Sequence, residues 1–380
     1  MFKIIHFADI LLDAPLLFRD SDKANIARTE QREALENLLS RAERENAEIV
    51  LISGGLFDRR YITRKTAYYI KSIFEKHRSL KIFIMPGAAD HYTADSIYSV
   101  FSLGENVHVF DSEEITKVSF TSKDGTKADI YGAASFSEKL SLAKFENFKT
   151  ELSRESDTVN VIMAPKTGDS YAVSTLMETG ADVIAFSCGG KSIGVVDDDG
   201  CLISDPGALV PVCFDGQEKH GYSLIACSKD HGDLICESEF VPFAKREYVS
   251  LEADISGAYD GEDVIEAVKE RIGSCGYINN NIVKVRIVGI TAEETVLPLD
   301  EIAGLVSEAG AYDVIVSDET APIAEYESRA SDQTLKGAFM SELGADIFGS
   351  VEEKRKAALS ALKIGLDAID GKDLLENAEK

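Results

Sequence analysis

Residues 3–15 read KIIHFADILLDAP, and this stretch decides how the rest of the chain is interpreted. The apolar run Ile4 to Phe7 predicts a short buried strand, and Ala8 to Leu11 then form the loop at its carboxyl end. Open α/β sheets place their ligands at the carboxyl ends of parallel strands. Asp9, the first acidic residue after the strand, is therefore the first candidate site residue.

Four later stretches have the same form, in which an apolar run ends in a short loop. They read SGGLFD at 53–58, PGAAD at 86–90, MAPK at 163–166 and FSCGGK at 186–191. Because parallel strands end at the same edge of a sheet, we expect the five loops to converge. This is the layout of a two-metal phosphoesterase site, although most of the residues that such chemistry needs are absent.

The order of the expected elements is typical of an α/β protein. Strands at 3–7, 48–53 and 81–85 alternate with helices at about 24–46 and 64–77, which predicts a mainly parallel first sheet. Beyond residue 107, shorter strands flank the hairpin turn Asp124-Gly125. Strands at 159–163, 183–186 and 201–204 follow, and those at 222–227 and 233–240 are expected to continue an antiparallel run. We therefore expect two sheets packed face to face with helices outside, an αββα sandwich.

At 380 residues the chain is too long for one typical core. We expect a main domain over 1–245 and a small α/β capping domain of β-α-β-α-β order over 246–325. A helical tail is expected over 326–380. One apolar stripe in this tail either packs on the chain itself or docks another protein, and the sequence leaves both open: Leu359, Leu362, Leu366 and Ile369.

The composition limits the partners. Lys and Arg number 40 against 66 Asp and Glu, so the formal net charge is −26. A surface of this charge repels a phosphate backbone, so direct DNA binding is not expected without a local basic groove or a basic partner. No apolar run is long enough to span a bilayer, and the N-terminus lacks the pattern of a cleaved signal. We expect a cytoplasmic protein that does not use a membrane.

With these five loops, the chain resembles the calcineurin-like metallophosphoesterase superfamily, in its SbcD and YhaO branch of DNA repair exonucleases. Residues 6–15 resemble that branch's H-x-A-D-x-H-L-D-x-P, and Gly54 to Asp58 resemble its G-D-L-F-D. Residues 87–90 stand where the family has G-N-H-D, and 187–191 where it has G-H-x-H-K. The resemblance extends to Asp205-Pro206-Gly207-Ala208 and to Thr334-Leu335-Lys336-Gly337, and it implies a metal-dependent hydrolase fold.

The same resemblance shows which ligands are missing. The family holds two Mn²⁺ ions with Asp, His and Asn side chains, and of these positions only Asp9 keeps a ligand of the expected type. Ala164 or Pro165 stands where the fourth loop supplies a His. The remaining family positions are occupied by residues that do not match it: Leu11 for a His, Gly55 for the bridging Asp, Ala88 for the Asn, Ala89 for the catalytic His, and Cys188 and Gly190 for the last His pair.

From these replacements we expect no bound metal, no cofactor and no catalytic residue. What remains is a vestigial site, defined here as Asp9, Asp58, Asp90, His91, Lys166 and Cys188. An unpaired buried carboxylate is costly, so a nearby cation is expected to compensate Asp9. Lys166, Arg59 and Arg60 lie in loops that converge on it and are the candidates.

Three functions follow from the resemblance. The first is a catalytically inactive relative of the repair exonucleases, which acts as a scaffold or subunit with an SMC-like coiled-coil ATPase of the SbcC or YhaN type and which dimerises. The second is an active nuclease or phosphodiesterase with a rebuilt one-ion site, for which the acids and histidine available are Asp9, Asp13, Asp58, Asp90 and His91. The third is a nucleotide-binding module that uses the emptied cleft.

Overall fold

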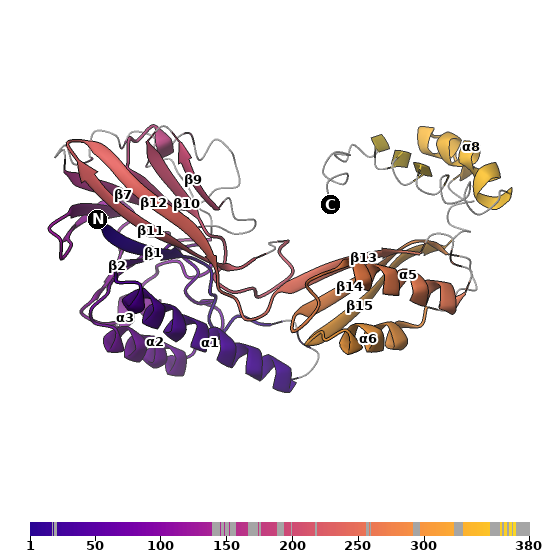
Figure 1. Cartoon of the computed structure of the whole chain (residues 1–380), viewed down its shortest axis with the longest axis horizontal. Coiled ribbons are helices and arrows are strands. Elements are labelled where there is room, and N and C mark those ends of the chain that lie inside the picture. The colour runs from indigo at the N-terminus through magenta and orange to yellow at the C-terminus, as the bar shows by residue number, and fades with distance from the viewer. Residues whose placement is uncertain are drawn as a thin grey trace. The chain divides into compact units, whose positions relative to one another are not determined.

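The chain divides into two compact units, Met1–Glu247 and Tyr248–Lys380 (Figure 1). The expected first boundary, after residue 245, lies close to this division, whereas the expected separate tail is grouped with the second unit. No helix in the described part of the chain is long and apolar enough to cross a membrane. The computed structural model describes residues 1–380 except for 17, 19–20, 139–144, 146–147, 149–151, 153–156, 166–173, 175, 188–193, 199, 217–218, 256–257, 259, 292–296, 323–329, 350–357, 359–360, 363–364, 367 and 370–380.

The first sheet of unit 1 has the strand order β12-β11-β1-β2-β3-β4. Its four parallel strands are β1 (Phe2–Phe7), β2 (Ala47–Ile52), β3 (Lys81–Ile84) and β4 (Val107–Val109). They alternate with α1 (Ser21–Arg44), α2 (Arg64–Lys76) and the short α3 (Ile97–Val100). The sequence predicts the first three strands and the first two helices, but not α3 or the parallel pairing of β4. The antiparallel pair β11 (Gly221–Asp230) and β12 (Asp233–Pro242) completes the sheet beside β1.

The place of β11 and β12 in the chain predicts that they extend the second sheet. This prediction is wrong, because both strands lie in the first sheet. Ile4 pairs with Ile225 across β1 and β11, so the second half of the unit returns to the first sheet. The second sheet has the order β5-β6-β7-β8-β10-β9. Its strands are β5 (Thr116–Thr121), β6 (Lys127–Gly132), β7 (Thr158–Pro165), β8 (Val183–Ser187), β9 (Gly194–Asp198) and β10 (Cys201–Asp205), with the predicted hairpin between β5 and β6.

The layers of unit 1 follow from where the apolar side chains are buried. Leu35, Leu38, Leu39 and Ala42 recur at helical spacing on α1 and pack against the outer face of the first sheet. A second cluster between the sheets contains Phe2, Ile49 and Phe83 from one side and Ile130, Val161 and Val183 from the other. A third, around Tyr131 and Ile162, covers the outer face of the second sheet. Unit 1 is therefore a two-sheet α/β sandwich.

Unit 2 begins with the predicted β-α-β-α-β unit. Three parallel strands in sequence order are joined by two helices that pack on one face of the sheet around Val264, Ile302 and Val306. The elements are β13 (Tyr248–Asp254), α5 (Gly261–Ser274), β14 (Ile282–Thr291), α6 (Leu299–Glu308) and β15 (Asp313–Pro322). In the described part of this unit, no group of His, Cys, Asp and Glu is placed to hold a metal ion.

The tail contains α8 (Leu335–Gly349), which packs against later residues of the tail. Leu362, from the predicted apolar stripe, is buried with Met340, and Leu366 is partly buried in the same cluster. A Cβ atom on Gly365 would lie 2.1 Å from the ring of Phe339, so these segments cross closely. Part of the stripe thus packs on the chain itself, and Leu359 lies outside the described residues.

Candidate functional site

The first two loops are joined by backbone hydrogen bonds. The N–H groups of Asp9, Leu11 and Leu12 donate to the carbonyl oxygens of Gly54, Gly55 and Leu56, with N···O distances of 3.1, 2.8 and 3.1 Å. Below the loops, the ring of buried His6 lies between the hydroxyls of Ser204 (2.7 Å) and Ser53 (2.9 Å), which ties the two sheets together. The sequence prediction that these strand ends converge is therefore correct for loops one and two.

The first loop has an unusual backbone. Asp9, Leu11 and Asp13 have φ values of 48°, 48° and 64°, in the left-handed region that residues other than glycine rarely adopt. Gly54 and Gly55 in the second loop have φ values of 88° and 66°. Such conformations cost free energy and cluster at functional sites. The first two loops thus have the kind of strained backbone that is common at functional sites.

Asp9 fills the space that a side chain on Gly55 would need. A Cβ atom built on Gly55 would lie 2.0 Å from Asp9 Oδ1 and 2.7 Å from Asp9 Cα. Real Cβ atoms do not approach other atoms so closely, and the second contact is to backbone, which cannot rotate away. The resemblance described above implies that Gly55 stands at the position of the family's bridging aspartate. A side chain at residue 55 would clash with Asp9 in the conformation that Asp9 has in this structure.

No cation compensates Asp9 in the described part of the chain, so the prediction of Arg59 or Arg60 as its partner is wrong. Arg60 instead forms an ion pair with Asp58 (2.9 Å), and Arg59 pairs with Asp95 (2.9 Å). Each cation has an acid closer to it in its own or a neighbouring surface loop. Lys166, the third candidate, lies outside the described residues.

Protonation replaces the missing cation. Burial of the carboxyl group, together with the negative charges of Asp90, Asp205 and Asp215, raises the pKa of Asp9 to about 8. The neutral acid is therefore the main form at neutral pH. Asp9 is half-buried, and binding a proton avoids the cost of holding an unpaired charge there.

The Asp90 carboxylate joins the second and third loops through hydrogen bonds. Its carboxylate accepts hydrogen bonds from the backbone N–H groups of Gly55 (2.9 Å), Leu56 (2.9 Å) and Gly87 (2.8 Å) and from the Tyr98 hydroxyl (2.7 Å). Burial and the charge of Asp90 raise the pKa of Tyr98 well above its usual value, so this hydroxyl keeps its proton and donates. With four donors around two oxygens, Asp90 has little capacity left for a ligand.

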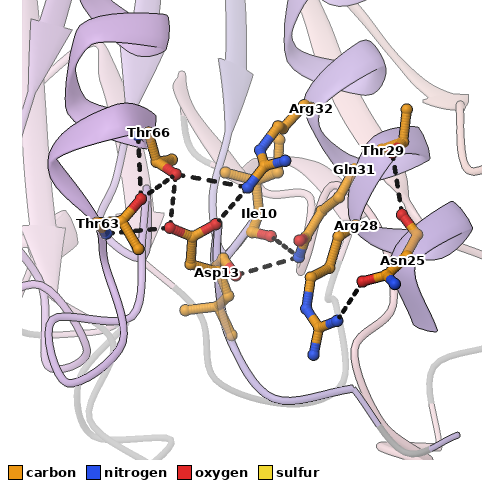
Figure 2. Close-up of polar contacts among 10 residues, drawn as sticks. Ile10, Asp13, Asn25, Arg28, Thr29, Gln31, Arg32, Thr63 and Thr66 are labelled. Atoms are coloured by element: carbon orange, nitrogen blue, oxygen red, sulfur yellow. Dashed lines mark hydrogen bonds and ion pairs between the residues drawn. The ribbon is translucent and has the colours of Figure 1, made fainter. Parts of the chain in front are cut away.

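Asp13 is likewise used by the fold. Figure 2 shows its carboxylate between α1 and the start of α2, where it accepts from Arg32 (2.8 Å), the Thr66 hydroxyl (2.6 Å) and the Thr63 N–H (3.1 Å). The side chain of Gln31 donates from α1 to the carbonyl oxygens of Ile10 (2.7 Å) and Leu11 (3.1 Å). These contacts hold the first loop in its strained conformation.

The remaining acids and histidine of the vestigial site also have protein partners. Burial raises the pKa of Asp58, but the hydrogen bonds and charge of Arg60 outweigh it and hold that pKa below its usual range. The His91 ring lies 3.0 Å from the carbonyl oxygen of Ala88 and 3.3 Å from Arg59. Ala88 and Ala89 carry no donor atoms, and Leu11 is an apolar side chain in the first loop. Cys188 and Gly190 lie outside the described residues.

These residues do not fit a pair of metal ions. A two-metal centre needs a bridging carboxylate and several further oxygen and nitrogen donors. Gly55, which the resemblance aligns with the bridging position, has no side chain, and Asp9 occupies the space for one. Among the described residues no group of three or more His, Cys, Asp or Glu side chains is placed to hold a metal ion.

The structure adds a titratable cluster that the sequence did not reveal. The buried ring of His220 lies between two carboxylates, with Nε2 3.1 Å from Asp215 and Nδ1 bonded to Glu247. Burial lowers the pKa of His220, but these two acids outweigh it and raise the pKa to about 9. Asp215 and Asp205 also act on Asp9 through their charge. Only the Asp205-Pro206-Gly207 turn carried a sequence signal, through its resemblance to the family.

Comparisons with known proteins give one sequence relative. No protein-family model matches the chain. The uncharacterized metallophosphoesterase YhaO of Bacillus subtilis is 28% identical over 133 residues, which cover 34% of this chain and 32% of the relative. The matched part thus spans about a third of that protein's length. This similarity supports a relationship to the metallophosphoesterases.

The solved structures that resemble the chain are distant. Vacuolar protein sorting 29 from Cryptosporidium parvum is 12% identical, with a TM-score of 0.29, and the match covers 63% of this chain and 98% of that chain. Vps29 from Entamoeba histolytica, solved in complex with zinc, is 9% identical, with a TM-score of 0.28 and coverage of 63% and 99%.

Proposed function

We propose that this protein is a catalytically inactive relative of the metal-dependent DNA repair exonucleases of the SbcD and YhaO type, retained as a scaffold or subunit. The relation between Asp9 and Gly55 carries this proposal. Hydrolysis by two metal ions requires an acid that bridges them. Here the bridging position has no side chain, and the single acid retained from the family's ligand set stands in the vacated space.

The rebuilt one-ion enzyme is the weaker alternative. It would use Asp13, Asp58 and Asp90 beside Asp9, yet each of these three acids is already bound by protein donors. Taking one of them as a metal ligand would break hydrogen bonds that fix the first and second loops. Asp9 itself gains a proton rather than a cation. These contacts favour the inactive scaffold.

The partner that we propose is the SMC-like coiled-coil ATPase implied by the resemblance, and the tail is the proposed contact. Leu335, at the start of α8, is 73% exposed, although other apolar residues of the tail are buried. An exposed leucine beside a packed helical cluster is suited to helix docking. Because the net charge is −26, we propose that contact with DNA is made through such a partner or a second copy.

Two measurements test the function. The full-length protein with excess Mn²⁺ is expected to leave double-stranded and single-stranded DNA and a chromogenic phosphodiester uncut. Hydrolysis that stops when Asp9 is replaced by Asn would contradict inactivity.

For the scaffold role, tagged protein is expected to retain a coiled-coil ATPase from its own cells, and Leu335→Glu should abolish the complex. Leu299→Glu, at the start of α6 and 37% exposed, is the matched control. Equal retention by both variants would exclude Leu335 as part of the contact.

A further inference from the structure

A cavity of about 590 Å³ lies between the start of α2 and the segment that contains α3. Its volume is within the range of small-molecule sites, roughly 300–1,000 Å³. Three arginines, Arg59, Arg60 and Arg64, and one acid, Asp95, line it, and Asp9 does not. The apolar part of the wall is formed by Phe57, Ile62, Ala67, Ile97 and Val100. The cavity therefore combines a cationic rim with an apolar wall, outside the vestigial site.

The cationic rim stands out in a chain whose net charge is −26. Arg59 and Arg60 are each paired with an acid, but Arg64 is exposed and has no hydrogen-bond or ion-pair partner among the described residues. Arg64 is also the first residue of α2, whose first turn contains no acidic residue. The start of a helix carries partial positive charge, which adds to that of Arg64. The Asp13 carboxylate contacts the same helix start through Thr63 and Thr66, and its negative charge offsets part of this positive charge.

Tyr68, one helical turn after Arg64 on α2, adds an exposed aromatic ring to the wall of the cavity. Tyr68 is 62% exposed, and its ring meets Phe101 edge to face, with centroids 4.9 Å apart. Val100 beside them is 68% exposed. An exposed tyrosine with a fixed ring orientation is a surface on which a planar ring can stack.

One hydroxyl in the wall is unsatisfied. Ser96 is 3% exposed, and its Oγ has no hydrogen-bond partner among the described residues. Leaving a buried hydroxyl unpaired is unfavourable, but this oxygen is itself buried, so a ligand would reach it only after the Ser96 side chain rotates. Arg64, Tyr68 and Ser96 thus line the same cavity, with the Ser96 hydroxyl buried in its wall.

We propose that this cavity binds a small compound that joins a flat ring to a phosphate, of the class of nucleoside monophosphates. The ring stacks on Tyr68 and Val100, and the phosphate contacts Arg64 and the start of α2. A single phosphate senses mainly charges within the Debye length, about 10 Å, whereas a long polyanion meets the acidic surface as a whole. A small phosphate therefore fits this cavity better than a nucleic acid. The site does not depend on the proposed scaffold role.

Calorimetric titration of the full chain tests the site, with adenosine 5′-monophosphate as the probe. We expect saturable binding of one equivalent. Adenosine and inorganic phosphate should each bind at least tenfold more weakly, because each lacks one half of the recognised group. Adenosine 5′-carboxylic acid distinguishes a phosphate site from a general anion site. Affinity equal to that of the monophosphate would contradict the assignment to phosphates.

Variants locate the site. Arg64→Gln and Tyr68→Ala should each weaken binding at least tenfold. The matched controls Lys65→Gln, an exposed cation in the same helical turn, and Tyr277→Ala, a tyrosine 61% exposed in unit 2, should leave it unchanged. Circular dichroism verifies that each variant is folded. No saturable binding at millimolar probe, equal losses in Arg64→Gln and Lys65→Gln, or a loss in Asp9→Asn without one in Arg64→Gln would overturn the proposal.

Discussion

Asp9 and Gly55 occupy one shared space: Oδ1 of Asp9 stands 2.0 Å from the point where a Cβ atom on Gly55 would lie. The resemblance to the metallophosphoesterases implies an acid at both positions, with two cations between them. In this chain the second position is a glycine, and the first has no cation among the described residues. The two loops are joined by backbone hydrogen bonds, which depend on neither side chain.

The first prediction concerns the space at Gly55. Gly55→Ala should lower the free energy of unfolding more than Gly125→Ala does. Both glycines have positive φ (66° and 88°), but only Gly125 has nothing within 4 Å of the added Cβ. The shared left-handed strain costs about 1 kcal/mol, and overpacking against Asp9 adds about 1–3 kcal/mol. Urea denaturation measures both. Equal losses would show that the space beside Asp9 is free.

The second prediction concerns the protonation of Asp9. The folded chain keeps this proton up to about pH 8, whereas the unfolded chain releases it near 3.8. The unfolded state therefore binds fewer protons between these values, and stability falls as pH rises through them. Asp9→Asn removes this loss and should stabilise the protein by roughly 2–4 kcal/mol at pH 8, with little change at pH 4. Denaturation at both pH values measures it. An Asp9→Asn variant that is less stable at pH 8 would contradict the raised pKa.

The third prediction concerns His220. Its pKa is raised from 6.5 to about 9, so its charged pairing with Asp215 and Glu247 stabilises the fold fully below pH 6.5 and is lost as pH rises to 9. At pH 6, His220→Gln should have a lower melting temperature than the wild type. At pH 9.5 the difference between the two melting temperatures should be smaller. His231→Gln, at a 93% exposed side chain, is the control. A constant difference from wild type at both pH values would assign His220 a packing role alone.

The fourth prediction concerns Asp90. Asp90→Asn keeps the shape of the side chain but removes the charge and one acceptor from three backbone N–H groups and the Tyr98 hydroxyl. We expect a loss of about 2–4 kcal/mol, because hydrogen bonds to charged groups contribute more than neutral ones. Tyr98→Phe, which removes one donor, should cost about 1 kcal/mol. If both variants cost the same in guanidinium denaturation, Asp90 does not organise the loops.

Much of the fold is predictable from the sequence, because local patterns set it. The spacing of Leu35, Leu38 and Ala42 predicts α1, and Asp124-Gly125 predicts the hairpin between β5 and β6. The return of β11 to the side of β1 is not predictable in this way. Alternating apolar residues indicate a strand, but they do not say which neighbour it pairs with.

The candidate site is likewise only partly predictable from the sequence. The sequence shows that Gly55, Ala88 and Ala89 lack donor atoms, since that is a property of residue type. It does not show that Asp9 lies in the space beside Gly55 or that Asp90 accepts hydrogen bonds from three backbone N–H groups, because both depend on loop conformation. Arg59 and Arg60 were assigned to Asp9 because they lie in a neighbouring loop, and acids nearer to them, Asp95 and Asp58, bind them instead. His220 meets Glu247 across 27 positions of sequence, a contact that only the fold creates.

Metal stoichiometry tests the central claim most directly. The full-length protein would be stripped with a chelator, dialysed against micromolar Mn²⁺ and analysed by elemental mass spectrometry and calorimetry, with a crystal soak in the same ion. We predict fewer than 0.1 equivalents of manganese per chain and no density for an ion beside Asp9. Two equivalents of Mn²⁺ that bind saturably, with two neighbouring ions held by a full set of protein donors at Asp9, would contradict it.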